Sequence, residues 1–178
     1  MLLREATPTD AGAIARLHTD SWRRTYRGAF SDEYLDGDID SERLAVWAER
    51  LTSPPDSQFT LLATKGDQLL GFACSFGAED PTWGTLVDNL HVAPEGSGKG
   101  LGRRLLADSA LWAEQHHPGG FYLWVLDQNA HARRFYEHVG AQNEGPEQIA
   151  TPDGGEVTQL RYVWPTIDPL RTFASESG

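Results

Sequence analysis

A segment between residues 96 and 102 has glycine at every second position and could bind an anionic ligand. It follows a strand-like run at residues 85–92 and leads directly into a segment with the apolar periodicity of a helix. Glycine lets backbone N–H groups approach a ligand closely, and the unpaired amides at a helix N-terminus favour negative charge. Lys99, Arg103 and Arg104 add cationic side chains beside those amides. This combination favours the binding of a diphosphate.

Two common phosphate-binding loops do not fit this segment. A Walker loop ending at Gly98-Lys99 needs glycine at position 93 and serine or threonine at position 100, where the sequence has Ala93 and Gly100. A dinucleotide-binding fingerprint that starts at Gly98 needs glycine at position 103, which is Arg103. The segment therefore represents another class of anion-binding loop.

The segment Ser97-Gly98-Lys99-Gly100-Leu101-Gly102 resembles the acyl-CoA loop of the GNAT acetyltransferases, whose pattern is Gln/Arg-x-x-Gly-x-Gly/Ala after a strand. Ser97 stands where the family has arginine or glutamine, so one side-chain contact is missing while the contacts from backbone amides remain. A second family signature, Asn-x-x-Ala-x-x-Phe-Tyr-x-x-x-Gly, matches the sequence from Asn129 to Gly140 at every specified position. The resemblance extends over residues 2–164.

This resemblance implies that acetyl-CoA is the acyl donor. Its pantetheine arm would lie between the strand ending at Val92 and the strand ending near Asp127, because parallel strands that splay leave unpaired amides and carbonyls. By the resemblance, the cofactor-binding residues are Leu90, Val92, Ser97, Gly98, Lys99, Gly100, Gly102, Arg103 and Asn129.

Tyr136 and Asp88 are the candidate catalytic residues. By the resemblance, an amine attacks the thioester in a ternary complex, a backbone N–H binds the oxyanion, and Tyr136 donates a proton to the leaving thiolate. An amine with a pKa near 10.4 is mostly protonated at pH 7, so a base assists the attack. Many family members have glutamate where this chain has Leu86, and Asp88 is the nearest carboxylate, expected on the same side of the strand as Leu86 and Leu90. We expect His91 to point to the opposite face and to be structural.

The acceptor amine should contact the first two helices and their connection, which wall the acceptor side in this family. The candidate substrate-binding residues are Trp22, Tyr26, Glu33 and Tyr34. Each candidate also has a structural alternative: Trp22 and Tyr34 could anchor a loop, Tyr136 could be a core aromatic, and Asp88 could be a strand-end acid. The acceptor is open among polyamines, amino acids, aminoglycosides, peptide N-termini and protein lysines.

The sequence thus predicts an N-acetyltransferase that acts on a primary amine. The rival interpretation is a non-catalytic acyl-CoA-binding module or sensor with the same fold. Ser97 and the missing early glutamate favour the sensor, whereas Tyr136 and Asn129 favour the enzyme.

The composition indicates a compartment for the protein and argues against some classes of partner. A single cysteine, Cys74, excludes an intrachain disulfide and suits a cytoplasmic protein. The N-terminus reaches a charge at Arg4 without a long apolar run, so we expect neither a signal peptide nor a membrane span. The net charge of −11 argues against nucleic-acid and anionic-membrane partners and could attract a cationic amine. His116-His117 lacks a partner at metal-ligand spacing, so we expect no metal.

Periodicity and turn signals predict the α/β (α+β) architecture that must position these residues. We expect the order strand, two helices, three strands, helix, strand, helix and two strands, which gives a mixed sheet of about seven strands and about four helices. This is also the element order of the GNAT fold, in which splayed parallel strands form the acyl-CoA cleft. We expect one domain at residues 1–164 and a weakly ordered tail at 165–178, and the last two strands offer an edge at which a homodimer could form.

Overall fold

The computed structural model describes residues 1–174, which form a mixed α/β structure. The strands are β1 Leu2–Glu5, β2 Gln58–Lys65, β3 Gln68–Asp80, β4 Gly84–Val92, β5 Phe121–Leu126, β6 Gln142–Ala150 and β7 Glu156–Trp164. The helices are α1 Ala11–Thr25, α2 Asp32–Asp36, α3 Ile39–Thr52, α4 Leu101–His116, α5 Ala130–His138 and α6 Asp168–Arg171, with 3-10 turns η1 Pro8–Asp10 and η2 Pro94–Gly96.

The helices that border the candidate site start at residues suited to capping. The backbone N–H of Thr7 donates to Asp10 Oδ2 at 2.8 Å, so a capping box leads through η1 into α1. Asn129 Oδ1 accepts from the N–H of Ala132 at 3.1 Å and caps α5. Both starts use residue types that are favoured at helix N-termini.

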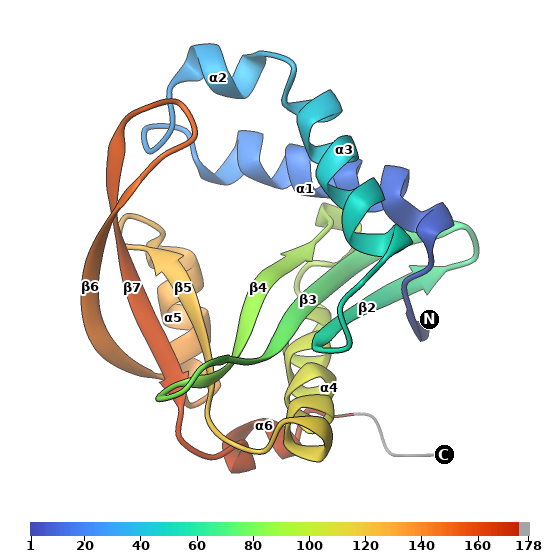
Figure 1. Cartoon of the computed structure of the whole chain (residues 1–178), viewed down its shortest axis with the longest axis vertical. Helices are drawn as coiled ribbons and strands as arrows, with labels where there is room; N and C mark the ends of the chain where they lie inside the picture. The colour runs from blue at the N-terminus through green and yellow to red at the C-terminus, as the bar shows by residue number, and fades with distance from the viewer. Residues whose placement is uncertain (175–178) are drawn as a thin grey trace.

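The seven strands form one sheet in the order β1-β2-β3-β4-β5-β7-β6. Among the strand pairs of residues 1–174, β4 and β5 alone run parallel, and their register covers just three pairs, from Thr85 opposite Phe121 to Val87 opposite Leu123. Beyond these pairs the two strands diverge toward α1, as Figure 1 shows. The predicted mixed sheet with splayed parallel strands is confirmed.

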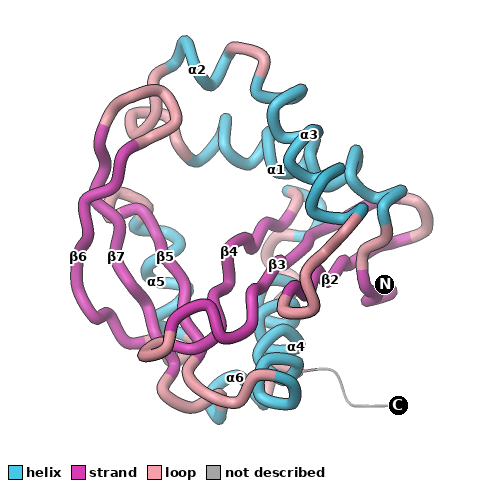
Figure 2. Tube along the Cα trace, in the orientation of Figure 1, coloured by secondary structure: helices cyan, strands magenta, loops and turns pink. Residues whose placement is uncertain are grey.

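Helices cover both faces of the sheet, as Figure 2 shows. They bury separate apolar clusters on the two faces. On one face, Ile14 and Leu17 of α1 and Trp47 of α3 pack against Phe72 of β3. On the other face, α4 and α5 share the largest cluster with β5 and β7, including Tyr136 of α5. The end of β4 that separates from β5 therefore lies between two helical layers.

Two short helices were not anticipated. Helix α2 lies in the connection between the first two expected helices, and Ser31 Oγ at its start accepts from the N–H of Tyr34. Helix α6 lies in the segment expected to be a weakly ordered tail, and it buries Leu170 completely against the same cluster as α4. Residues 175–178 of that expected tail lie outside the described residues. None of the helices within residues 1–174 combines the length and hydropathy that a membrane span requires.

Candidate active site

A cavity of about 450 Å³ opens where β4 and β5 separate. Its walls come from α1, α3, β4, β5, α5 and the end of β6 with its turn into β7. The polar and aromatic residues that line it include His18, Ser21, Trp22, Tyr26, Arg43, Arg50, Asp88, Asn89, His91, Asn129 and Tyr136. The fold thus brings both predicted catalytic residues to one cavity.

One edge of β4 has no strand partner at this cavity. Residues 89–92 pair with β3 on one side, while β5 contributes no residue paired with β4 after Leu123. The N–H of Ala93 donates to Leu70 O on the β3 side, so by the alternation of an antiparallel pair the backbone groups of Leu90 and Val92 point away from β3, toward the gap. An amide-bearing ligand could pair with such an edge as an added strand.

The glycine-rich loop next to this edge has the backbone geometry of an anion-binding loop. Gly98 has φ +72° and Gly100 has φ +76°, in the left-handed region, and α4 begins directly after Gly100. The N–H groups of residues 98–103 have no acceptor within the described part of the chain, whereas that of Arg104 donates to Gly100 O. The loop therefore presents a run of unpaired donors at a helix N-terminus.

The basic side chains of the loop already have partners. Lys99 Nζ donates to Glu95 O at 2.7 Å, and Arg103 Cζ lies 5.1 Å from the centroid of the Phe173 ring. Arg104 forms an ion pair with Asp108 at 3.7 Å, and Ser97 is exposed. A ligand at this loop would thus meet backbone donors first and would need modest side-chain movement to recruit the cations.

Tyr136 is buried at the wall formed by α5. Its ring packs against Phe135, Tyr162 and Trp164, with centroids 5.2 to 6.2 Å apart. Its hydroxyl has no hydrogen bond to a described residue, and the residue lines the cavity. Burial, with a smaller contribution from Tyr26, raises the pKa of Tyr136 above that of a free phenol, so the group stays protonated at neutral pH. The hydroxyl can therefore donate a proton into the cavity.

Asp88 is the extra residue of a β-bulge in β4. Cys74 of β3 pairs with Asn89, but Ser75 pairs with Val87, so Asp88 has no residue opposite it. Its carboxylate accepts from Arg50 Nη1 of α3 at 2.8 Å, and the same nitrogen donates to Asn89 Oδ1 at 3.1 Å. The bulge therefore directs Asp88 toward the face covered by α1 and α3.

The bulge also reverses two expectations about the strand faces. Leu90 packs on the α4 side, so it does not share a face with Asp88. His91, expected on the opposite face, lies on the α1 side, where its Nδ1 is 2.8 Å from Ser21 Oγ. The expected alternation was wrong here because one inserted residue changes the face of every residue after it.

His91 and His18 form a pair of uncharged imidazoles in the wall of the cavity that Asp88 also lines. Their ring centroids are 4.7 Å apart. Burial lowers the pKa of His91 to about 4 and that of His18 to about 2; His91 and nearby arginines add smaller contributions for His18, and Arg24 adds one for His91. Trp47 Nε1 donates to His18 Nδ1 at 3.0 Å, which fixes the orientation of the His18 ring. Both rings are neutral at pH 7.

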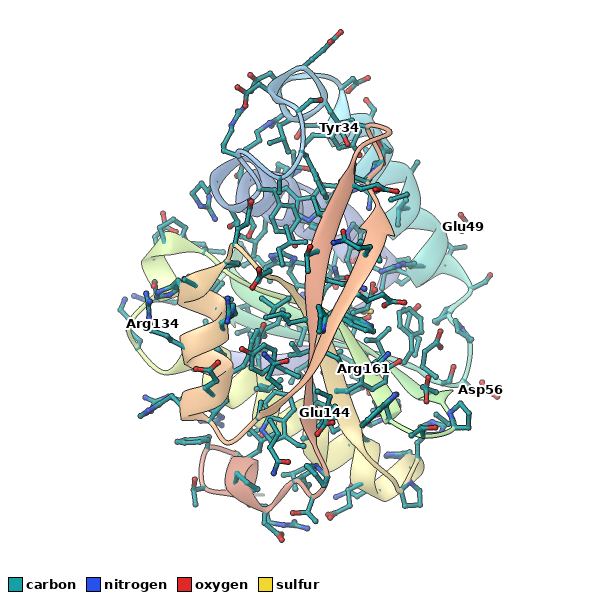
Figure 3. All side chains as sticks on the ribbon, turned by 90° about the vertical axis from the view of Figure 1, so that its left-hand side faces the viewer. Tyr34, Glu49, Asp56, Arg134, Glu144 and Arg161 are labelled. Atoms are coloured by element: carbon teal, nitrogen blue, oxygen red, sulfur yellow. The ribbon has the colours of Figure 1, made fainter. Side chains whose placement is uncertain are left out.

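The structure separates the four predicted substrate-binding residues into two groups. Trp22 and Tyr26 line the cavity, and burial together with Asp88 raises the pKa of Tyr26 to about 12. Tyr34 lies outside it, near the turn between β6 and β7, and donates to both carboxylate oxygens of Glu42 (Figure 3). Glu33 is exposed on α2 and also lies outside the cavity.

Several cavity residues were missed by the sequence interpretation. Arg43 and Arg50 of α3 are seven residues apart, about two helical turns, which places them on one side of the helix. His18 and Ser21 lie on α1 near Trp22, which was identified. The helical spacing was a usable signal, but nothing in the sequence showed that this side faces a cavity.

Comparison with known proteins gives consistent matches over most of the chain. The model of the acetyltransferase (GNAT) family matches residues 15–141. An uncharacterized N-acetyltransferase, YuaI, of Bacillus subtilis is 30% identical over 178 aligned positions, which cover 96% of each chain.

Solved structures share the fold at lower identity. A putative acetyltransferase of the GNAT family from Desulfovibrio desulfuricans superposes with a TM-score of 0.71 at 22% identity, covering 92% of this chain and 98% of that one. The putative acetyltransferase yncA from Salmonella typhimurium, solved with its cofactor acetyl-CoA, has a TM-score of 0.66 at 19% identity, covering 100% of this chain and 96% of that one.

Proposed function

Because this chain belongs to the acetyltransferase (GNAT) family, we propose that it transfers the acetyl group of acetyl-CoA to a primary amine by direct attack in a ternary complex. The observation that carries the proposal is the unpaired edge of β4, which lies between the unpaired amides of residues 98–103 and the cavity that contains Tyr136. One ligand with a diphosphate, an amide-bearing arm and a thioester matches these three features in order.

The donor-binding residues follow from these features. The diphosphate would accept from the N–H groups of residues 98–103, with Lys99 and Arg103 as mobile cations. The pantetheine arm would pair with the backbone of Leu90 and Val92, opposite Asn129 at the start of α5. Ser97 does not prevent this arrangement, because the backbone donors require no particular side chain.

The acid in this proposal is Tyr136. The amine nitrogen bonds to the thioester carbon, the carbon–sulfur bond breaks, and the departing thiolate takes the proton of Tyr136. A backbone N–H near Val92 stabilises the oxyanion before the bond breaks. The substrate ammonium loses two protons during the reaction; one restores Tyr136 and the other passes to solvent, so the proton count balances.

Asp88 is the proposed acceptor of the first ammonium proton. The carboxylate lines the cavity and is held by Arg50, so its position is fixed by two elements. At pH 7, an amine with a pKa near 10.4 is neutral about once in two thousand molecules, a deficit of roughly 4.5 kcal/mol. A positioned proton acceptor reduces this deficit during the attack.

The proposal is tested first by acetyl-CoA binding and then by turnover of amines. At about one hundred times the dissociation constant, acetyl-CoA adds roughly 2.7 kcal/mol of stability, which for a chain of this size is on the order of 5 to 10 °C in Tm. A similarly charged nucleotide without the pantetheine arm should give a clearly smaller shift. Thiol release with a panel of primary amines then separates the enzyme from a non-catalytic acyl-CoA sensor, which would show the shift without amine-dependent release.

A further inference from the structure

The charge of the cavity wall differs from that of the whole chain. The sequence carries a net charge of −11, which led us to expect attraction of a cationic amine. Among the described residues that line the cavity, the charged side chains are those of Arg43, Arg50 and Asp88. Arg50 forms an ion pair with Asp88. Arg43 is therefore the cationic side chain whose ion-pair partner does not belong to the cavity wall.

Arg43 has an unused hydrogen-bond donor. Its Nη2 contacts the carboxylate of Glu42, which does not line the cavity, and its Cζ lies 4.8 Å from the centroid of the Trp22 ring. Its Nε is buried and has no acceptor within residues 1–174. A guanidinium that stacks on an aromatic ring keeps a fixed plane, so this N–H has a defined direction.

His18 supplies a second unused donor in the same wall. Its Nδ1 accepts from the Trp47 indole, which can only donate, so the proton of the neutral ring is on Nε2. That Nε2 is buried and has no partner in the described part of the chain. His18 itself lines the cavity, although only 2% of the residue is exposed. The His18 and Trp22 ring centroids lie 4.8 Å apart, and Arg43 Cζ lies 4.8 Å from the Trp22 centroid, so both donors belong to side chains that contact the Trp22 ring.

Arg43 Nε and His18 Nε2 are both hydrogen-bond donors without a partner among the described residues. Buried polar atoms almost always have partners, and a buried donor without one disfavours the empty state. Of the buried side-chain atoms without partners in residues 1–174, these two belong to the cavity wall, and both are N–H groups. They require an acceptor from the ligand, and a carboxylate supplies two acceptor oxygens in one group and forms charge-assisted hydrogen bonds with a guanidinium.

We propose that the acceptor carries a carboxylate beside its primary amine, so that it is a free amino acid or a closely related zwitterion, and that Arg43 and His18 bind this carboxylate. The proposal rests on the proposed acetyl transfer, since it names the substrate class of the same cavity. Protonated polyamines carry no acceptor for these donors, and aminoglycosides offer neutral hydroxyl and ether oxygens but no carboxylate. Asp88, held by Arg50 in the same cavity, remains available for the amine end of the zwitterion.

The test compares matched acceptors that differ in the carboxylate. Common amino acids, their carboxamides and the corresponding decarboxylated amines are each assayed by thiol release, together with spermidine and kanamycin. For at least one set, such as lysine, lysinamide and cadaverine, kcat/KM should be at least about tenfold higher for the amino acid than for its carboxamide or its decarboxylated amine. Equal or faster turnover of the carboxamides, decarboxylated amines, spermidine or kanamycin overturns the carboxylate proposal and leaves acetyl transfer standing.

Variants of Arg43 test whether the cavity wall causes the preference for a carboxylate-bearing acceptor. Arg43→Gln should remove the preference for the carboxylate, whereas Arg16→Gln, an exposed arginine of α1 outside the cavity, should retain it. Arg43→Lys keeps the charge but lacks the Nε donor and should retain part of the preference. A preference that persists in Arg43→Gln overturns the assignment.

A binding measurement covers the case in which no acceptor is turned over. N-acetyl amino acids and their amides are titrated against the protein with and without CoA, and Tm is followed. A shift from the carboxylate alone that is lost in Arg43→Gln supports the carboxylate site independently of catalysis. Equal shifts from both forms, or no shift from either, overturn it.

Discussion

Arg50 Nη1 lies 2.8 Å from Asp88 Oδ2, and this ion pair joins helix α3 to the bulge of β4. Arg50 also stacks on Trp47 and Phe76, with Cζ 5.2 and 5.4 Å from the ring centroids. The pair is partly shielded, with 29% of the Arg50 side chain and 32% of the Asp88 side chain exposed. Its main effect is positional, because it holds the carboxylate at the cavity instead of leaving it mobile on an exposed bulge.

We predict that Asp88→Asn lowers kcat at pH 7 at least about tenfold and that the difference from wild type narrows toward pH 10. The amide cannot accept the ammonium proton, but at high pH the amine is neutral without help. Initial rates of thiol release from pH 6 to pH 10 provide the measurement. Asp40→Asn is the matched control, because Asp40 forms an ion pair with Arg23 at 2.7 Å outside the cavity. A pH profile of Asp88→Asn parallel to that of wild type contradicts the base assignment.

For Tyr136, we predict that Tyr136→Phe lowers kcat at least about tenfold while acetyl-CoA binding is retained. The ring remains to pack against Tyr162 and Trp164, so the variant removes the proton donor with little change in the core. The raised pKa of Tyr136 means that the loss should be similar at every pH from 6 to 9. Tyr122→Phe, which changes another buried tyrosine that does not line the cavity, should leave kcat unchanged. Unaltered turnover in Tyr136→Phe would remove this residue from the mechanism.

The sequence predicted the order of the main elements well, because periodicity and capping are local signals. The seven strands and the four longer helices follow the expected order, and the glycine loop leads into α4 at Leu101. The bulge at Asp88 was not predictable in this way, since it depends on how β4 pairs with β3 and leaves no mark on the composition of the strand. The error in the faces of Leu90 and His91 followed from that single residue.

The composition of the cavity was predictable only in part. Trp22 and Tyr26 were found because α1 was expected to wall the acceptor side. Arg43 and Arg50 were missed because arginines on an amphipathic helix usually face solvent, and tertiary packing decides otherwise here. Helix α6 was missed for a related reason: its four residues gain their order from burying Leu170, not from helix propensity.

The buried histidines predict a loss of stability in mild acid. The unfolded chain binds a proton at each histidine near pH 6.5, whereas the folded pKa is about 4 for His91 and about 2 for His18. The unfolded state therefore binds more protons below pH 6.5, so stability is full above that pH and falls as the pH decreases toward 4. From pH 7 to pH 5 the expected loss is about 2 kcal/mol per histidine, measured by urea unfolding.

Single variants separate the two contributions. His91→Gln should reduce the difference in unfolding free energy between pH 7 and pH 5 by about 2 kcal/mol, because a non-titrating side chain replaces one proton-linked group. His131→Gln changes an exposed histidine of α5 and should leave the difference as in wild type. A difference that is the same in His91→Gln and wild type would show that the acid sensitivity arises elsewhere.

The loop glycines predict a separation between stability and donor binding. An added Cβ at Gly98 would have no atom within 4 Å, so Gly98→Ala should cost only the left-handed backbone strain of about 1–2 kcal/mol. Gly66, in the turn between β2 and β3, has φ +59° and equally open surroundings, so Gly66→Ala should cost a similar amount. The two variants thus match in strain but differ in position, because Gly98 alone lies at the proposed diphosphate site.

Titration with acetyl-CoA distinguishes Gly98→Ala from Gly66→Ala. We expect Gly98→Ala to weaken acetyl-CoA binding about tenfold or more, because the methyl group occupies space where the diphosphate must approach the unpaired amides. Gly66→Ala should bind acetyl-CoA as wild type does. Equal affinity in all three proteins, measured by calorimetry, would place the diphosphate away from residues 98–103 and contradict the proposed donor site.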